Sequence, residues 1–156
     1  MKRRLGVISD THGLLRPEAV HALRGSDVII HAGDIGSSEV LHSLEELAPV
    51  IAVRGNNDRG PWAKALPLSE SLELGRASIY VLHDVNELDL DPRVAGFSVV
   101  IAGHSHQPRS EERDGVLFFN PGSAGPRRFR LPISVGKILI DGARVTGLLE
   151  TLEIPR

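Results

Sequence analysis

Five short apolar runs in this chain each end at a residue whose side chain can bind a metal ion. The runs LGVIS, VIIHAG, VIAVRG, IYVL and VVIAG are followed by Asp10-Thr11-His12, by Asp34, by Asn56, by His83 and by His104-Ser105-His106. Carboxylate, imidazole and amide groups together suit divalent transition metals. One such residue would be weak evidence, but five in register with five apolar runs predict a metal site.

Apolar, β-branched runs of this length, bounded by polar or glycine-rich segments, indicate buried strands. We expect these strands at Leu5–Ser9, Asp27–His31, Val50–Val53, Ala77–Leu82 and Ser98–Ala102. Ligands of open α/β sheets bind beyond the carboxyl ends of the strands, so the polar residues should meet at one edge. In an extended segment alternate side chains share a side, which explains the one-residue gap in Asp10-Thr11-His12 and His104-Ser105-His106.

The first half of the chain alternates strands with helices. A helix is expected over Arg16–Arg24, with Pro17 as its first helical residue. A second helix is expected after a cap at Ser37 or Ser38, and Pro49 should end it. This β-α-β-α-β order predicts parallel strands with right-handed crossovers.

The second half is mostly strand. Two Asp-Gly pairs, Asp114-Gly115 and Asp141-Gly142, each lie between strand-like runs, which is a strong hairpin signal. The sequence therefore predicts two sheets with helices outside them.

The composition limits the classes of protein. At 156 residues the chain is most simply one domain, 1–156, and it has no cysteine, which fits a reducing cytoplasm. The apolar stretch after the N-terminal MKRR stops at Asp10, and no run approaches a membrane span. The net charge of -2 gives no electrostatic reason to expect nucleic acid or an anionic membrane as a partner.

The motifs DTH at 10–12, GD at 33–34, GNND at 55–58, His83, GHSH at 103–106 and NPGS at 120–123 together resemble the calcineurin-like metallophosphoesterase superfamily. Within it the chain is similar to the small, single-domain phosphodiesterases. The resemblance covers residues 5 to 140 with every motif in the family's order. It implies an α/β fold, a four-layer α-β-β-α sandwich of two mixed β-sheets flanked by helices, and a two-metal site.

By this resemblance, Asp34 is the carboxylate that bridges two metal ions. One metal would also bind Asp10, His12 and His106, and the other Asn56, His83 and His104. The cofactors would be two divalent transition-metal ions, with manganese the first choice over iron, cobalt, nickel or zinc. A hydroxide held between them would attack the phosphorus of a small-molecule phosphoester in line.

Several further positions follow from the resemblance. Many members carry a histidine general acid where this chain has Asn57, and asparagine cannot donate a proton at neutral pH. We take Asn57 and Asp58, which could orient a group at 57, as the candidate catalytic positions. His83 is followed by Asp84-Val85 instead of the family's Gly-His. The candidate substrate contacts are Asn120, Ser123 and Arg127, and His31 is expected to have a structural or supporting role.

Two alternatives remain open beside a metal-dependent phosphodiesterase. A phosphomonoesterase, acting on nucleotides or proteins, would share the metal site, but Asn57 disfavours it. A non-catalytic protein-binding scaffold would keep the fold without turnover, as a retromer sorting subunit of this fold does. The complete ligand set favours the enzyme. The natural substrate, the metal and the oligomeric state, including a homo-oligomer, stay open.

Overall fold

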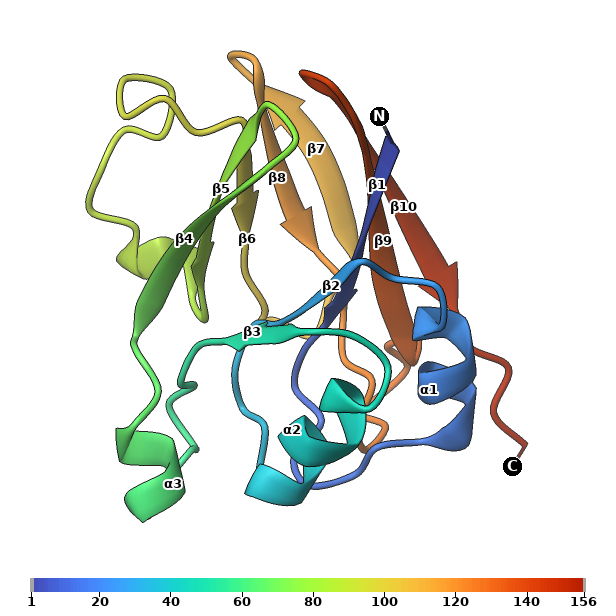
Figure 1. Ribbon diagram of the computed structural model, residues 1–156. Coiled ribbons are helices and arrows are strands. Elements are labelled where there is room, and N and C mark those ends of the chain that lie inside the picture. The colour runs from blue at the N-terminus through green and yellow to red at the C-terminus, as the bar shows by residue number, and fades with distance from the viewer. Residues whose placement is uncertain (1, 156) are drawn as a thin grey trace.

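Two five-stranded sheets packed face to face form the molecule, as the computed structural model shows for residues 2–155 (Figure 1). The first sheet has the order β10-β9-β1-β2-β3 and the second the order β4-β5-β6-β8-β7. Both sheets are mixed, and the few helices lie outside the sandwich, mainly over the first sheet, which confirms the predicted α/β fold class.

The first sheet contains the alternating half of the chain. Strands β1 (Lys2–Ile8), β2 (Val28–His31) and β3 (Val50–Ala52) are parallel, as predicted. The hairpin of β9 (Ser134–Asp141) and β10 (Arg144–Thr151) adds antiparallel to β1. Strand β1 begins three residues earlier than expected because Lys2 already pairs with β9.

Two helices cover the outer face of the first sheet. Helix α1 (Pro17–Leu23) starts at the predicted proline, and α2 (Ser38–Glu45) ends before Pro49. Their apolar side chains pack with Ile8 and Ile29 of the sheet. The hydroxyl of Ser37 makes no capping hydrogen bond although Ser37 occupies the cap position, so the predicted cap contact is wrong. Apolar packing, and not capping, therefore fixes this helix.

The second sheet comes from the middle of the chain. Its strands are β4 (Ser69–Leu74), β5 (Ala77–Leu82), β6 (Val99–Ile101), β7 (Arg109–Arg113) and β8 (Val116–Asn120). The β7–β8 hairpin turns at Asp114-Gly115, where both residues have positive φ, as the predicted Asp-Gly turn requires. Strand β4 was not predicted, because this edge strand carries alternating polar residues instead of an apolar run.

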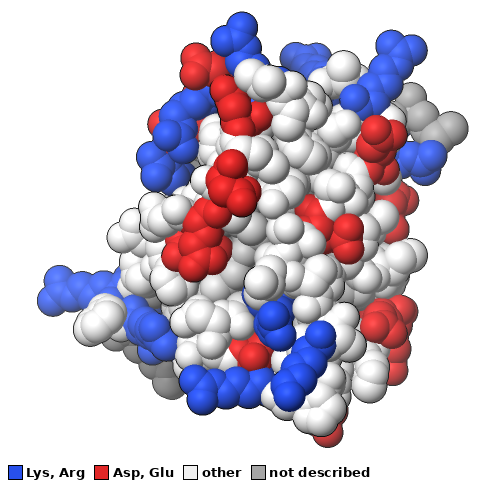
Figure 2. Space-filling model, turned by 90° about the vertical axis from the view of Figure 1, so that its left-hand side faces the viewer, with Lys and Arg blue, Asp and Glu red and all other residues white. Residues whose placement is uncertain are grey.

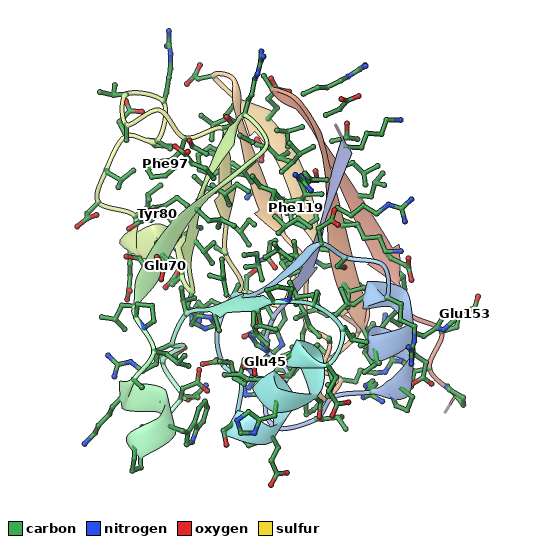
Figure 3. The ribbon with its side chains drawn as sticks, in the orientation of Figure 1. Glu45, Glu70, Tyr80, Phe97, Phe119 and Glu153 are labelled. Atoms are coloured by element: carbon green, nitrogen blue, oxygen red, sulfur yellow. The ribbon has the colours of Figure 1, made fainter. Side chains whose placement is uncertain are left out.

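The main core lies between the two sheets and consists of side chains from both. Phe119 of β8 projects across this core onto the first sheet (Figure 3). Its ring occupies the space that a Cβ would need at Gly136 of β9, and it also lies against Gly147 of β10. These glycines therefore let the sheets approach closely beside the end of β8.

The outer layer over the second sheet is thin. It consists of η1 (Val85–Glu87) and the segment 88–97 (Figure 1). In this segment Leu88 packs on the sheet, and the ring of Phe97 lies tilted against that of Tyr80 with ring centroids 5.2 Å apart (Figure 3). Helix α3 (Pro61–Lys64), which joins β3 to β4, packs through Trp62 with the helices of the first sheet. Of the helices described in residues 2–155, none has the length and apolarity needed to cross a membrane.

Charges of both signs are spread over the side of the molecule that carries β4 and η1. Figure 2 shows acidic side chains over the middle of this face and basic side chains along its lower edge. On this face neither sign of charge dominates.

Candidate metal centre

The predicted ligands come from the carboxyl ends of strands in both sheets. Asp10 and His12 follow β1, and Asp34 follows β2, both in the first sheet. His83 follows β5 and His106 follows β6, both in the second. The site therefore lies where the two sheets meet, and neither sheet could form it alone.

Two groups of side chains have ligand atoms within 4.8 Å of one another, namely Asp10, His12 and His106, and Asp10, Asp34 and His83. In the first group Asp10 Oδ1 lies 3.3 Å from His106 Nε2 and 4.0 Å from His12 Nε2. In the second, Asp34 Oδ2 lies 3.3 Å from His83 Nε2. Each group has the spacing that a single divalent ion needs.

Both carboxylates lie between the histidines. Asp34 Oδ2, from the residue expected to bridge, is 3.9 Å from His12 Nε2 as well as close to His83. Asp10 Oδ1 is also 3.9 Å from His83 Nε2, so Asp10 belongs to both groups, whereas the sequence placed it with one metal only. The two groups therefore share a continuous set of ligand atoms.

Three of these atoms, Asp10 Oδ1, His12 Nε2 and His83 Nε2, are buried without a hydrogen-bond partner among residues 2–155, and so is the other ring nitrogen of His106, Nδ1. The close carboxylate–imidazole pairs lack the direction of a hydrogen bond at Asp10 Oδ1 and His83 Nε2. Buried polar atoms are almost always paired, since an unpaired one costs about 1–3 kcal/mol. Four unpaired atoms in one place fit a site that holds a metal ion.

The other atoms of these ligands are fixed by hydrogen bonds. Asp10 Oδ2 accepts from Ser9 Oγ at 2.7 Å and from the backbone N–H of His104 at 3.0 Å. His83 Nδ1 donates to the carbonyl of Ala32 at 2.7 Å, which leaves Nε2 directed at the carboxylates. Such outer partners set the tautomer and orientation of a metal-binding histidine.

The charges of the site shift its pKa values. Burial lowers the pKa of His83, but Asp34 and Asp10 outweigh it and raise that pKa to about 9. Burial raises the pKa of Asp34, but His83 and the hydrogen bonds from Asn57 bring it below its ordinary value. The pKa of Asp10 is also lowered, because the effects of His106, His83 and Ser9 exceed that of burial. Without metal, His83 is therefore protonated at neutral pH.

Asn56 and His104 lie beside these groups on a more open groove. Both line a groove of about 560 Å³ together with His83, and both are exposed. The ring of His104 meets that of His83 edge-on at 5.2 Å, and its Nε2 lies 3.7 Å from Asp84 Oδ2. Asp84, which replaces the family's glycine, thus faces the outer nitrogen of a predicted ligand.

Five of the seven predicted ligands have a left-handed backbone, with φ between 47° and 69°: Asp10, His12, Asp34, His104 and His106. Left-handed residues other than glycine are uncommon and cost about 1–2 kcal/mol each. They bend the chain sharply after each strand, which turns the side chains toward the common centre.

Three glycines make these bends sterically possible. A Cβ at Gly55 would overlap the side chain and backbone of Asp34, and one at Gly33 would overlap the ring of His83. A Cβ at Gly103 would overlap Ser9 Oγ and Asp10 Oδ2. The glycine in each of the GD, GN and GH motifs is thus required for contact between loops.

The two candidate catalytic positions have different surroundings. Asn57 donates its backbone N–H to Asp34 Oδ1 at 2.9 Å and its Nδ2 to Asp34 Oδ2 at 3.1 Å. Asp58 is buried, and its carboxylate accepts the backbone N–H groups of Ile35, Gly36 and Gly55 at 2.8–3.0 Å. Asp58 therefore holds the loop after β2 to the loop after β3, and its expected role of orienting a group at 57 stays a prediction.

The predicted substrate contacts also serve the backbone. Ser123 Oγ is buried and donates to the carbonyl of Asp10 at 3.0 Å. Asn120 Nδ2 donates to the carbonyl of Gly103 at 2.9 Å, so it holds the loop that carries His104. These hydrogen bonds hold the loops that carry the ligands, and the expected substrate contacts of both residues stay predictions. Arg127 is exposed in the segment that follows.

A buried hydrogen-bond chain below the ligands was only partly foreseen. His31 Nδ1 accepts the N–H of Gly33 at 3.1 Å, so Nε2 donates to Thr11 Oγ1 at 3.0 Å, and Thr11 donates to the carbonyl of Ile35 at 2.8 Å. Burial lowers the pKa of His31 to about 3, which keeps the ring neutral. His31 has the structural role expected of it, but Thr11 was missed, because a threonine between two ligands gives no signal of its own.

Comparison with known proteins gives the same family as the motifs. Residues 3–142 match the calcineurin-like phosphoesterase superfamily domain. A probable metallophosphoesterase of Methanothermobacter thermautotrophicus is 38% identical over 153 residues, covering 90% of this chain and 88% of the relative. A phosphodiesterase of Methanocaldococcus jannaschii is 31% identical over 137 residues, covering 76% and 82%.

The fold is also shared with solved structures. Vacuolar protein sorting 29 of Cryptosporidium parvum superposes with a TM-score of 0.83 at 21% identity, covering 97% of this chain and 92% of that one. At this identity the likeness concerns the fold alone.

The contacts of Asp58 predict that replacing its carboxylate lowers the stability of the fold. Asp58→Asn should lower the free energy of unfolding of the metal-free protein by about 3 kcal/mol, because it turns an N–H group toward buried backbone donors. Urea unfolding measures the change, and Asp89→Asn, at an exposed carboxylate, is the control and should stay within about 0.5 kcal/mol. Equal stability of the two variants would show that the loops do not depend on this carboxylate.

The raised pKa of His83 predicts proton release on metal binding. The ion that binds His83 must displace the proton on Nε2, so about one proton should be released when that ion binds at pH 7.5, and its affinity should rise roughly tenfold per pH unit up to about pH 9. Calorimetry in buffers with different ionisation enthalpies measures the release. His83→Asn should abolish it, and His42→Gln, at an exposed position on α2, should not. Buffer-independent heats for the wild type would contradict the assignment.

Proposed function

Because this chain belongs to the calcineurin-like phosphoesterase superfamily, we propose that it is a phosphodiesterase that works with two divalent metal ions. The observation that carries the proposal is the set of four buried, unpaired side-chain atoms that the predicted ligands place at the junction of the two sheets. The relative of Methanocaldococcus jannaschii, which is named a phosphodiesterase, supports the choice of reaction.

The residues present fit two ions. One ion would take Asp10, His12 and His106, and the other His83 with Asn56 and His104 from the open groove, with Asp34 shared between them. When bound, the ions would supply Lewis acidity toward a phosphoryl oxygen and a hydroxide at neutral pH for in-line attack. Histidine, carboxylate and amide ligands accept several transition metals, and manganese is the first to test.

The chain's own residues prepare this site. Asn57 holds both oxygens of Asp34, so the shared carboxylate keeps one orientation. Ser9 and the His104 N–H hold Asp10 in the same way. Since Asn57 is no acid, the chain places no proton donor at the position where many relatives carry histidine, and the departing oxygen must leave unassisted by residue 57. Substrates with acidic leaving groups should therefore react fastest.

The groove beside the site suits a small substrate. Its volume of about 560 Å³ is within the range for small-molecule ligands, and Arg54 and Tyr80 are among its lining residues. Arg127 lies in an exposed segment just beyond Gly125, whose backbone packs against Asp10 and Thr11. We propose that Arg54 and Arg127 attract the anionic phosphodiester toward the centre.

A protein-binding scaffold is the less suitable function. A scaffold gains nothing from four unpaired buried atoms or five left-handed residues, both of which reduce stability. Such costs persist at sites whose geometry is needed for function.

The test is a metal-by-substrate screen. Protein stripped with a chelator and reloaded with manganese should hold up to two ions per chain and hydrolyse bis(4-nitrophenyl) phosphate. Asp34→Asn should lower the number of ions bound per chain, and it should lower the hydrolysis rate at least about 100-fold, because the shared ligand loses its charge. Asp141→Asn, at an exposed hairpin residue, is the control. Reloaded protein without metal or without activity would refute the proposal.

Asn57 gives a sharper prediction on mechanism. The rate should depend steeply on the acidity of the leaving group, and Asn57→His should recover part of the roughly 10²–10⁴-fold benefit of a general acid, mainly on poor leaving groups. Asn57→Ala is the matched control, because it also loses the side-chain hydrogen bond to Asp34 but keeps the backbone one. If the wild-type rate did not change with the acidity of the leaving group, cleavage of the ester bond would not limit the rate.

A further inference from the structure

A second, smaller pocket lies on the outer face of the second sheet. It has a volume of about 220 Å³ and is bounded by η1 on one side and by β7 and β8 on the other. His104 and Asp84 line both this outer-sheet pocket and the groove of the candidate metal centre. A substrate whose phosphate lies at the centre could therefore place one of its ester groups here.

The floor of the outer-sheet pocket is apolar. Val100 and Ala102 of β6 are buried, and with Phe118 of β8 they form part of the small apolar cluster on this face. The layer outside the second sheet is only η1 and a loop, so the pocket lies directly on β6 and β8. An apolar floor of this kind favours the flat face of a ring.

The rim of the pocket is polar and planar. The amides of Asn86 and Gln107 are exposed, and neither side chain hydrogen-bonds within the described part of the chain. Each amide offers a donor and an acceptor. The guanidinium of Arg113 lies over the Phe118 ring with its carbon 4.2 Å from the centroid, and such a planar cation stacks well on aromatic rings.

We propose that the outer-sheet pocket binds a nucleobase carried by one ester group of the substrate, so that the substrate class is a nucleoside phosphodiester. The apolar floor takes the face of the ring, and Asn86 and Gln107 take its heteroatom edge. A plain phenyl ring would leave those amides without partners. The volume holds one ring system and not a whole substrate, which fits a group attached to a phosphate at the neighbouring centre.

This inference rests on the proposed function, because the metal centre supplies the position of the phosphate. The test compares adenosine 5′-monophosphate with ribose 5-phosphate, which share sugar and phosphate and differ only in the base. Calorimetry on the metal-loaded full chain should give at least about fivefold tighter binding for the nucleotide, as expected for one stacked base. A phosphate assay after each titration confirms that the ligands stay intact.

Two variants locate the effect. Asn86→Ala and Arg113→Met should each bring the affinity ratio toward one, while binding of ribose 5-phosphate stays unchanged. Arg144→Met, at an exposed arginine of β10 in the other sheet, is the matched control and should keep the ratio. A ratio of one in the wild type, or a ratio that both pocket variants leave unaltered, would overturn the proposal.

Failure of the proposed function has a different signature. Adenosine and ribose carry no phosphate, so their binding to the metal-stripped chain, followed by NMR, probes the pocket alone. Preference for adenosine without hydrolysis of bis(4-nitrophenyl) phosphate by reloaded protein would leave the pocket standing and refute the phosphodiesterase. Hydrolysis without any preference for adenosine would support the phosphodiesterase and refute the nucleobase pocket.

Discussion

Direct contact between the loops at the strand ends is the constraint on which the site depends. Gly33, Gly55 and Gly103 each leave no room for a Cβ, since that space already holds atoms of His83, Asp34 or Asp10 and Ser9. The loops can therefore donate backbone N–H groups straight to carboxylate oxygens. Those bonds fix one side of each carboxylate and leave the other side directed at the imidazoles.

This arrangement places several destabilising features at one junction. Five left-handed residues and four unpaired buried atoms lie at the same junction, and each lowers the stability of the metal-free chain. The buried parts around it provide the compensation: the core between the sheets, the Asp58 carboxylate with its three donors, and the neutral His31 chain. A bound metal would add stability directly, because ligand binding to the folded state is folding free energy.

The two sheets contribute unequally to what surrounds the centre. Helices α1 and α2 cover the first sheet, so its outer face is closed. Over the second sheet η1 and a loop leave part of the outer face open, and the outer-sheet pocket lies there, next to His104. Specificity, on this view, resides where the covering layer is thinnest, while the ligands lie in the loops at the junction of the two sheets.

The sequence by itself determined most of the strands, the parallel pairing of β1, β2 and β3, and both Asp-Gly hairpins. It also determined that Asp10, His12, Asp34, His83 and His106 meet at the junction. These follow from local signals, since apolar runs mark buried strands and the carboxyl ends of strands collect polar residues. The polar strand β4 and helix α3 were not predicted from the sequence, because neither has an apolar run.

Only the tertiary structure decided what each polar side chain faces. It directed Asp58, Asn120 and Ser123 to backbone groups, placed Asp10 between both sets of histidines, and set Asp84 beside His104. The reason is that these partners lie far apart in sequence, and a single residue type gives no sign of which loop will pack against it. The sequence specifies the chemical groups of the site, and the packing of the two sheets specifies their contacts.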